Sequence, residues 1–262
     1  MNLSNIKPKY RLGQNFLIDN NVLNRIVTSC GFEKDDQVLE IGAGLGALTR
    51  NIAPIVGKVF AVETDRQLCE ELKKNCPQDN IDIIHADFLK YNLSLLPDGL
   101  KAIGNLPYYI SSPIVGKIVE YRKKFISLSI TVQLEFGNRM VALPSTKDYS
   151  AFSCFVQYYT VPKILFKIKN SCFRPKPKVD SCFLDMQIRK SPLHPAKNEE
   201  LLWKIVHAAF GQRRKVITNS LLPVIPKEKL LIILESLKLA PSLRAENLSI
   251  KDFVDITNLC SA

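Results

Sequence analysis

Four consecutive residues, Asn105-Leu106-Pro107-Tyr108, combine a carboxamide, a rigid bend and an aromatic ring. Proline has no N–H group and a fixed φ angle, and it favours an extended conformation for the preceding residue, so the carbonyl groups here stay available as acceptors. The Asn105 side-chain oxygen and a neighbouring carbonyl could accept both N–H bonds of an exocyclic amine, while Tyr108 stacks on the ring carrying that amine. The stretch predicts a pocket for a base such as adenine; the alternative is an ordinary Asn-Pro turn.

A second candidate group is the glycine-rich stretch Gly42-Ala43-Gly44-Leu45-Gly46, which follows the apolar segment 37–41. Glycines at a turn from strand to helix let a ligand approach the backbone and the helix N-terminus closely. The next predicted strand, 58–62, leads into Glu63, where a carboxylate can bind both hydroxyls of a ribose. With Ala47 the spacing also fits a dinucleotide-binding fingerprint, so a nicotinamide-dependent enzyme is a competing interpretation.

The residues after the third predicted strand, 81–85, separate these two interpretations. Asp87 and Phe88 place a carboxylate and an aromatic ring at its tip. This pair suits an adenine ring whose amino group donates to the carboxylate, whereas a nicotinamide-binding protein would have a second nucleotide-binding half after the fourth strand. The alternative for Asp87 is a helix cap or a loop acid. His85, inside the apolar segment, is interpreted as a satisfied core residue.

Strands and helices alternate along most of the chain. Helices are expected over 20–30, 47–56, 65–75, 113–123 and 134–143, and strands over 37–41, 58–62, 81–85, 100–104 and 125–133. Further strands are expected near 150–168 and 179–188. The alternation predicts an α/β protein with a doubly wound sheet, in which ligands bind at the carboxyl ends of the strands.

The sequence changes character at 189–195, after which only helical patterns remain, near 201–210, 227–239 and 249–259. We therefore predict two domains, 1–189 with the pocket and a small all-helical domain, 190–262, that docks onto the substrate. A protein ending near residue 190 is expected to fold and to keep its cofactor site.

Composition and charge favour a polyanionic partner. The 262 residues carry a net charge of +11, which suits nucleic acid or an anionic membrane surface. No segment approaches the length of a membrane span, and residues 1–15 lack the apolar core of a secretion signal. The seven cysteines are scattered and never spaced C-x-x-C, and the three histidines lie far apart. We expect a cytoplasmic protein with reduced cysteines and no metal site.

Basic residues gather in three places that are predicted to contact the phosphates of a nucleic acid. They are Lys7, Lys9 and Arg11 in the N-terminal arm, Lys176 and Lys178 in a proline-rich loop, and Arg213, Arg214 and Lys215 on a helix. A solvated surface is the alternative for each. The loop also contains Phe173, an aromatic residue expected to need a stacking partner. The arm ends in Gly13-Gln14-Asn15-Phe16-Leu17. Because its last two residues are apolar enough to be buried, we expect the arm to dock onto another surface.

Five motifs, in the same order along the chain, resemble those of the KsgA-type ribosomal RNA adenine dimethyltransferases. They are Gly13–Leu17, Val38-Leu39-Glu40-Ile41-Gly42-x-Gly44-x-Gly46, Asn105–Tyr108, Phe173-x-Pro175-x-Pro177-Lys178-Val179-Asp180-Ser181 and Arg213-Arg214-Lys215. The resemblance covers nearly the whole chain. It implies a class I, Rossmann-like methyltransferase that uses S-adenosylmethionine to dimethylate N6 of two adjacent adenosines near the 3′ end of small-subunit (16S) rRNA.

The resemblance also implies roles for individual residues. The cofactor-binding residues would be Asn15, Leu17, Gly42, Gly44, Gly46, Glu63, Asp87, Phe88 and Asn105, and the target-adenine site would be Asn105, Leu106, Pro107, Tyr108 and Phe173. The protein would act as a monomer on an immature small subunit, without a metal or a membrane. Three positions depart from the family pattern: Ala43 replaces a usual Pro, which would leave the loop less stiff, Tyr109 replaces a common Asn, and Leu134 a frequent Lys.

Two further hypotheses remain at this point. An Erm-type enzyme, which methylates an adenosine of large-subunit rRNA, shares the cofactor and Asn-x-Pro-Tyr motifs. A nucleic-acid-binding protein that kept the fold but lost catalysis is the other. The Arg213–Lys215 segment and the Phe173 loop favour small-subunit rRNA, and the intact Asn105–Tyr108 set with Glu63 and Asp87 favours an enzyme.

Overall fold

The computed structural model describes residues 13–261, which form two compact units. The first unit holds the described residues up to Gly137 together with Val161–Ile188, and the second holds Asn138–Thr160 together with the residues from Arg189 onward. The chain therefore passes from the first unit to the second twice. The predicted boundary near residue 190 corresponds to the second passage, but the prediction assigned residues 138–160 to the wrong side.

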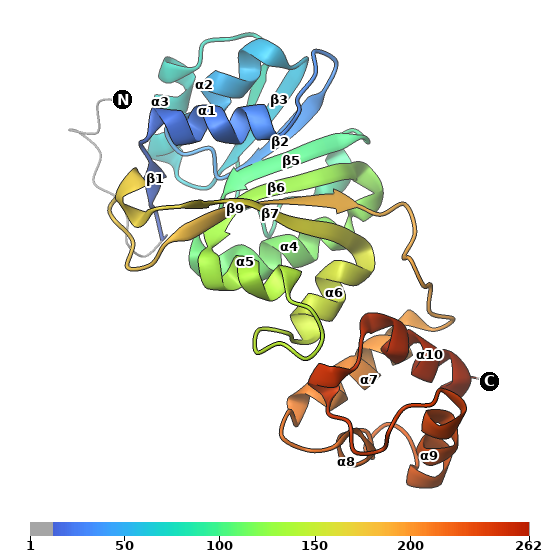
Figure 1. Cartoon of the computed structure of the whole chain (residues 1–262). Helices are drawn as coiled ribbons and strands as arrows, with labels where there is room; N and C mark the ends of the chain where they lie inside the picture. Colours follow the sequence, from blue (N-terminus) through green and yellow to red (C-terminus); the bar gives the residue numbers. More distant parts are fainter. Residues whose placement is uncertain (1–12, 262) are drawn as a thin grey trace. The chain divides into compact units, whose positions relative to one another are not determined.

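A sheet of seven strands forms the centre of the first unit (Figure 1). Its order is β4 (Ile81–His85), β3 (Lys58–Glu63), β2 (Gln37–Ile41), β5 (Leu100–Asn105), β6 (Phe125–Gln133), β9 (Ser181–Ile188) and β7 (Thr160–Ile168). Strands β4 to β6 are parallel, and β9 runs antiparallel to β6. The chain leaves β2 toward β3 and β4 and then returns to β5, so the switch point of the sheet lies between β2 and β5. Ligands bind at such a point, beyond the carboxyl ends of the strands.

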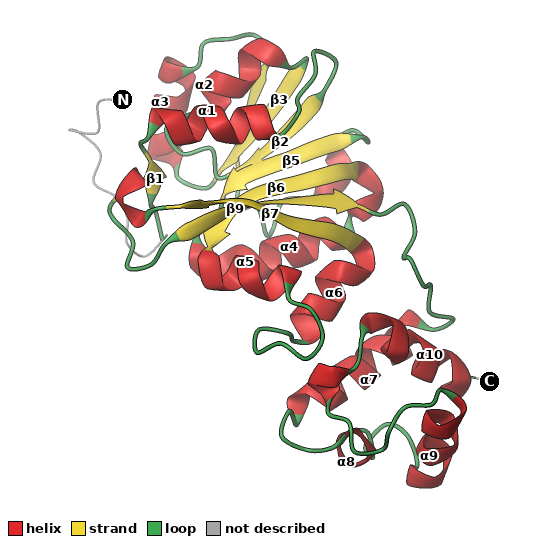
Figure 2. Cartoon of the chain, in the orientation of Figure 1, coloured by secondary structure: helices red, strands yellow, loops and turns green. Residues whose placement is uncertain are grey.

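Helices cover both faces of this sheet, as expected of a doubly wound fold. Figure 2 shows α1 (Asn20–Ser29), α2 (Thr49–Ile52) and α3 (Arg66–Asn75) on one side and α4 (Ser111–Glu120) on the other. Asp19 and Asp65 cap α1 and α3, because each carboxylate accepts a backbone N–H of the first turn. The helix predicted over 47–56 is shorter, since it continues beyond Ile52 as a 3₁₀ turn that contains Pro54.

The short strands β1 (Phe16–Leu17) and β8 (Phe173–Arg174) pair antiparallel, with Leu17 opposite Phe173. Both side chains are buried in the same hydrophobic cluster as Ile26 and Phe183. The expectation that residues 13–17 dock is thereby confirmed. Phe173, which the sequence predicted to need a stacking partner, is buried against apolar side chains, because the long-range pairing of β8 with β1 brings it into this cluster.

The second unit is helical. Its helices are α6 (Ala151–Tyr159), α7 (Glu199–Gly211), α8 (Ile217–Ser220), α9 (Lys227–Ser236) and α10 (Ile250–Cys260), and the chain enters it within α5 (Leu134–Val141). The strand expected near 150–168 is wrong in its first half, because Ser150 and Ser153 form a capping box that begins α6. Only its second half is a strand, β7.

Helix α6 is tied to α7 by a cluster of aromatic and polar side chains. The hydroxyl of Tyr159 donates to Glu199 (2.6 Å) and that of Tyr158 to the same carboxylate (3.3 Å). The indole N–H of Trp203 donates to the Tyr159 oxygen (3.2 Å), and Phe155 packs edge-on against Trp203. We call Phe155, Tyr158, Tyr159, Glu199 and Trp203 the aromatic cluster. It explains why residues 138–160 belong to the helical unit.

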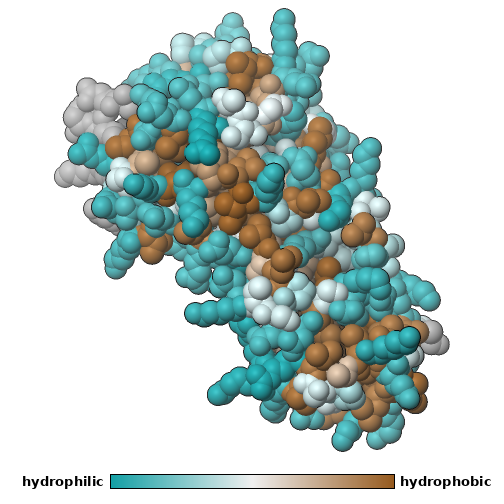
Figure 3. All heavy atoms as spheres, in the orientation of Figure 1, coloured by the Kyte–Doolittle hydropathy of each residue, from teal (hydrophilic) through white to brown (hydrophobic). Residues whose placement is uncertain are grey.

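The face of the molecule drawn in Figure 3 is mainly polar. On the face drawn in Figure 3, hydrophilic side chains predominate, and patches of apolar atoms interrupt them. No helix between residues 13 and 261 is long and apolar enough to cross a membrane.

Candidate functional site

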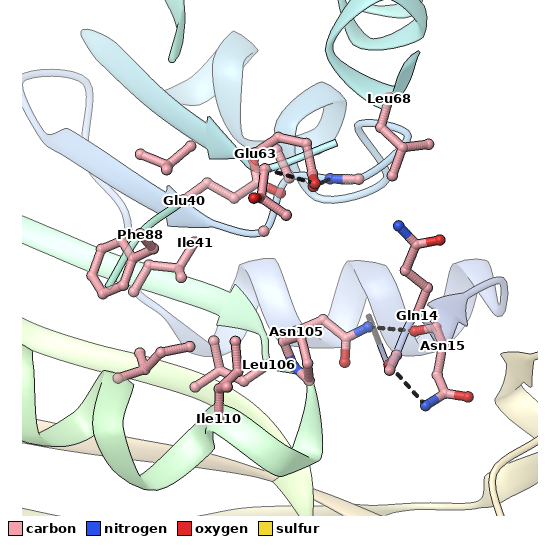
Figure 4. Close-up of a pocket in the computed structure, with 18 of the residues that line it drawn as sticks. Gln14, Asn15, Glu40, Ile41, Glu63, Leu68, Phe88, Asn105, Leu106 and Ile110 are labelled. Atoms are coloured by element: carbon pink, nitrogen blue, oxygen red, sulfur yellow. Dashed lines mark hydrogen bonds between the residues drawn. The ribbon is translucent and has the colours of Figure 1, made fainter. Parts of the chain in front are cut away.

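A cavity of about 320 Å³ opens at the carboxyl ends of β2 to β5. Its walls come from the arm before α1, the turns after β2, β3 and β4, and the stretch after β5 (Figure 4). This volume is within the range of small-molecule sites. The sequence-predicted residues that line it are Asn15, Leu17, Gly42, Gly44, Glu63, Asp87, Phe88, Asn105, Leu106, Pro107 and Tyr108. Segments far apart in sequence thus meet where the predicted fold required.

Two predicted residues lie elsewhere. Gly46 has φ +80°, and a Cβ there would come within 2.6 Å of Cys76 Sγ and 2.7 Å of Leu72 Cδ1. Its glycine is needed for packing against α3, and it does not line the cavity. Phe173 is 3% exposed and also lies outside the lining. In this structure it supports the docked arm, and its ring is not free to stack on a base.

The turn after β2 exposes backbone to the cavity. Gly42 has φ +73°, and a Cβ added to it would meet nothing within 4 Å. The backbone N–H groups of Gly42 and Ala43 both donate to the Val62 carbonyl, at 2.9 and 3.2 Å. A proline at position 43 could not make the second bond. The departure at Ala43 therefore does not leave the turn loose, because a hydrogen bond to β3 takes the place of the ring.

Glu63 ends β3 with a carboxylate that the backbone holds in place. Its Oε2 accepts the Gly44 N–H (2.8 Å), and its Oε1 accepts the N–H groups of Thr64 and Asp65 (2.8 and 2.9 Å). Burial raises the pKa of Glu63, and these three bonds oppose the rise. Since a carboxylate has about four acceptor positions, one remains for a ligand hydroxyl.

The Asn105 carboxamide has a defined orientation. Its Nδ2 donates to the Asn15 backbone carbonyl at 2.8 Å (Figure 4). A carbonyl can only accept, so the amide nitrogen must face it, and the oxygen Oδ1 is left as an acceptor at the cavity. The docked arm thus fixes which atom of Asn105 a ligand meets.

A second acceptor and an aromatic ring adjoin Asn105. The Pro107 carbonyl already accepts from Ser111 Oγ (3.1 Å) and the Ile110 N–H (3.2 Å), so the Leu106 carbonyl is the better candidate for the neighbouring acceptor. Tyr108 is half-buried and lines the cavity, and burial raises its pKa. Tyr109, one of the departures from the family pattern, is exposed, and its ring lies over Gly13.

Asp87 and Phe88 lie at the tip of β4, as predicted. The Asp87 carboxylate accepts the Leu89 N–H at 3.0 Å, and Phe88 is buried against the cavity. His85, expected in the core, is exposed, and its Nε2 lies 3.2 Å from the Thr64 carbonyl. Strand β4 is the edge of the sheet, and none of its residues is buried.

Two side chains near the cavity were missed by the sequence analysis. Glu40 is 1% exposed, accepts the Thr49 hydroxyl at 2.6 Å, and burial raises its pKa to about 8. The sequence did contain an indication of this role, because Glu40 is an acidic residue within the apolar segment 37–41. Lys117 of α4 donates to the carbonyls of Leu89 (2.8 Å) and Tyr91 (2.6 Å) and lies 5.6 Å from the Phe88 ring centre, with a pKa lowered by burial. Nothing in the sequence signalled that contact.

The predicted RNA-binding cations differ in their surroundings. Lys7, Lys9 and Arg11 lie outside the described residues, while Lys176, Lys178, Arg214 and Lys215 are exposed. Arg213 donates to Glu246 (3.0 Å) and to the Lys147 carbonyl (3.2 Å). The segment 213–215 is a turn after α7 rather than the helix that was expected. Arg213 thus has a structural partner that its two neighbours lack among the described residues.

Comparisons with known proteins agree with this geometry. Residues 5–262 match the family model "Ribosomal RNA adenine dimethylase". Proteins named ribosomal RNA small subunit methyltransferase A are similar: the one from Alkaliphilus metalliredigens is 40% identical over 98% of this chain and 94% of its own, and the one from Clostridioides difficile is 38% identical over 97% and 91%.

Solved structures are similar over the whole fold. A dimethyladenosine transferase from Plasmodium falciparum has a TM-score of 0.82 at 25% identity, covering 92% of this chain and 95% of its own. The 23S rRNA methyltransferase ErmE has a TM-score of 0.75 at 26% identity, covering 95% and 100%. The fold is that of the class I methyltransferases, and the chain belongs to the ribosomal RNA adenine dimethylase family.

Proposed function

We propose that this protein dimethylates N6 of two adjacent adenosines near the 3′ end of 16S rRNA in an immature small subunit, with S-adenosylmethionine as methyl donor. The observation that carries the proposal is the fixed Asn105 carboxamide, whose oxygen faces a cavity beside the Leu106 carbonyl and the Tyr108 ring. The names of similar proteins from Alkaliphilus metalliredigens and Clostridioides difficile support the small subunit as substrate. The resemblance further supports action as a monomer in the cytoplasm.

The residues of the cavity fit S-adenosylmethionine. Gly42 leaves open space at a left-handed backbone position, where a ligand can approach the main chain. Glu63 retains one acceptor position for a ribose hydroxyl, and Asp87 and Phe88 offer a carboxylate and a ring for adenine. When bound there, this cofactor supplies a methyl group already activated on a sulfonium.

The residues of the target site act by orientation and hydrogen bonding. The lone pair of adenine N6 is delocalised into the ring, so the amine is a weak nucleophile. Asn105 Oδ1 and the Leu106 carbonyl would accept hydrogen bonds from both N–H groups before the first transfer, and one of them from the remaining N–H before the second. These bonds favour a more pyramidal nitrogen and stabilise the positive charge developing on it. In each transfer the N–CH3 bond would form as the S–CH3 bond of the cofactor breaks, and the nitrogen would then release one proton to solvent. Tyr108 stacks on the base and partly offsets the cost of leaving the RNA stack, about a few kcal/mol. No side-chain nucleophile is needed for this transfer.

The test is transfer of labelled methyl groups to small subunits isolated from cells that lack this modification. Naked 16S rRNA and large subunits are the matched controls, and nuclease digestion followed by mass spectrometry identifies the product. We expect N6,N6-dimethyladenosine in the small subunits. Label in large-subunit rRNA would support the Erm-type alternative, and no label in any substrate would support the non-catalytic one.

Cofactor binding is tested separately by calorimetry. Glu63→Ala removes an acceptor for the ribose and should weaken S-adenosylmethionine binding by about 1–3 kcal/mol. Unchanged affinity would refute the ribose assignment without touching the choice of RNA.

A further inference from the structure

The Tyr108 hydroxyl is anchored from within the sheet. It forms a hydrogen bond of 2.8 Å with Ser181 Oγ, in which either atom can donate. Ser181 is fully buried, whereas Tyr108 is half-buried and lines the cavity. The two residues are 73 positions apart in sequence, so this contact is a product of the fold.

Ser181 itself is held rigidly. It is the first residue of β9, and it lies opposite Gln133 at the end of β6. The preceding residue, Asp180, accepts the Leu134 N–H through its carbonyl (3.0 Å) and the Asn170 N–H through its carboxylate (2.9 Å). Strand β6 also pairs with β5, which carries Asn105 opposite Thr131. The hydroxyl is thus placed relative to Asn105 by consecutive strands of one sheet.

The phenolic oxygen of a tyrosine lies on the axis of its ring, so a hydrogen bond at this oxygen fixes χ1 and the direction of that axis. Because the O–H bond prefers the plane of the ring, the same hydrogen bond also favours one ring plane, although less strongly. Burial raises the pKa of Tyr108, so its hydroxyl stays protonated and keeps this bond near neutral pH. Ser129, another buried serine of the sheet, has a different partner, because it donates to Asp185 at 2.7 Å. Ser181, by contrast, bonds to a side chain that lines the cavity.

We propose that Ser181 is a positioning residue for the target adenine: its hydroxyl holds the Tyr108 ring in the orientation on which the base stacks. The inference rests on the proposed function and deepens it. Ser181 does not touch the base, and its effect passes through Tyr108 alone.

Two single variants and their combination test the pair. Tyr108→Phe keeps the ring and removes its anchor, and Ser181→Ala removes the anchor's partner. Each should lower kcat/KM for small subunits about five- to tenfold, as expected for one lost hydrogen bond. The double variant should lie within about twofold of the single ones, because both changes remove the same contact. The affinity for S-adenosylmethionine, measured by calorimetry, should stay within about twofold of the parent.

Ser129→Ala is the matched control, since it removes a buried serine hydroxyl from β6 without touching the cavity. All measurements are made at a temperature at which circular dichroism shows each variant to be folded. Should Ser181→Ala fail to fold, Ser181→Cys replaces it, because a thiol has similar shape and bonds weakly.

The positioning role is refuted if the single variants match an active parent, if their losses multiply in the double variant, or if Ser129→Ala loses as much as Ser181→Ala. A parent protein that does not methylate small subunits would refute the proposed function instead.

Discussion

The cavity of the first unit and the aromatic cluster of the second use polar side chains in opposite ways. In the cavity, backbone groups hold the two side chains with free acceptor atoms: three N–H groups fix Glu63, and the Asn15 carbonyl fixes Asn105. Tyr108 and Glu40 bond to side chains instead, and Tyr108 offers its ring to a ligand. In the second unit, side chains hold one another, as Glu199 does with Tyr158 and Tyr159, and Glu246 with Arg213.

The difference separates residues that can bind from residues that stabilise. When the backbone binds one polar atom of a side chain, another polar atom can remain free to bind a ligand. In Asn105 this atom is Oδ1, because Nδ2 is the atom that donates to the backbone. The Glu199 carboxylate, by contrast, already accepts hydrogen bonds from Tyr158 and Tyr159, and these bonds stabilise the unit. Aromatic and charged residues therefore indicate ligand binding in the first unit and stabilisation in the second, although the sequence alone does not distinguish the two roles.

The largest effect should come from Asn105→Ala, which removes an acceptor aimed at the reacting amine. We expect the methylation rate at saturating cofactor to fall about 100- to 1000-fold, by analogy with the loss of one preorganised hydrogen-bonding group in other enzymes. Cofactor affinity should change much less. Single-turnover kinetics and calorimetry check this pair of outcomes, and a parent-like single-turnover rate would contradict the acceptor role.

In the second unit, Trp203→Ala should reduce stability rather than methyl transfer itself. It removes a half-buried indole that contacts Phe155 and donates to Tyr159, at a cost of about 2–3 kcal/mol in the free energy of unfolding. Trp203→Phe keeps most of the packing and is the control. Urea unfolding gives the free energies, and a loss below about 0.5 kcal/mol would show that the cluster does not hold the unit together.

The same cluster changes the expectation for a protein that ends near residue 190. Such a chain would keep Tyr158 and Tyr159 but lose Glu199 and Trp203, with which they bond. We therefore expect it to be less stable than the full chain, and not the cleanly separable domain that the sequence indicated. A thermal unfolding curve equal to that of the full chain would instead support a domain 1–189 that is stable by itself.

The site was more predictable from sequence than the second unit. Gly42, Glu63, Asp87 and Asn105 each end a strand or begin a turn, and the rule for parallel sheets brings such positions together. Their spatial meeting required only that the strands be identified correctly. The orientation of Asn105 could not be predicted, because it depends on the docked arm.

The differences from the predicted fold have two physical causes, an ambiguous local pattern and contacts between residues distant in sequence. Residues 151–159 are apolar or aromatic apart from Ser153 and Gln157, and a short, largely buried helix of this kind cannot be distinguished from a buried strand by periodicity. The Ser150 capping box contains Ser153 in place of the usual Glu or Gln. The contacts of Phe173 with Leu17 and of Arg213 with Glu246 could not be predicted, because these partners are distant in sequence.

The next effect concerns Glu40, whose carboxyl the fold buries beside the cavity. Its pKa rises from 4.5 to about 8, so the folded protein keeps a proton that the unfolded chain releases above about pH 4.5. Its contribution to stability is fully present below pH 4.5 and is lost as the pH rises through about 8. Between pH 6 and 7 the loss should be about 1 kcal/mol, since one proton corresponds to at most about 1.4 kcal/mol per pH unit.

Glu40→Gln keeps the shape of the protonated form and cannot titrate, so it should remove this part of the pH dependence. Urea unfolding at pH 6 and pH 7 gives, for each protein, the change in the free energy of unfolding between the two pH values. The difference between the two changes is the contribution of Glu40, because the other titrating groups contribute equally to both proteins. Parallel pH profiles would show that Glu40 is ionised in the folded protein.

The smallest effect distinguishes two adjacent arginines. Arg213 is paired with Glu246, and the half-exposed pair should contribute about 1 kcal/mol or less to stability. Arg214 is exposed and should contribute to RNA binding alone. Arg213→Ala should therefore lower the urea midpoint slightly, and Arg214→Ala should leave the midpoint unchanged while weakening binding to small subunits.

Salt dependence gives the sharper measurement for this pair. Loss of one phosphate contact reduces the slope of log K against log salt by about 0.7–0.9, so Arg214→Ala should flatten the plot by about that amount. Arg213→Ala should leave the plot nearly unchanged, because its guanidinium is bonded to Glu246 and the Lys147 carbonyl. Equal slopes for both variants and the parent would place the RNA contacts elsewhere in the chain. An equal flattening by both would mean that Arg213 exchanges Glu246 for phosphate on binding. A side chain of the second unit that is bonded to another side chain would then also bind a ligand, contrary to the distinction between the two units.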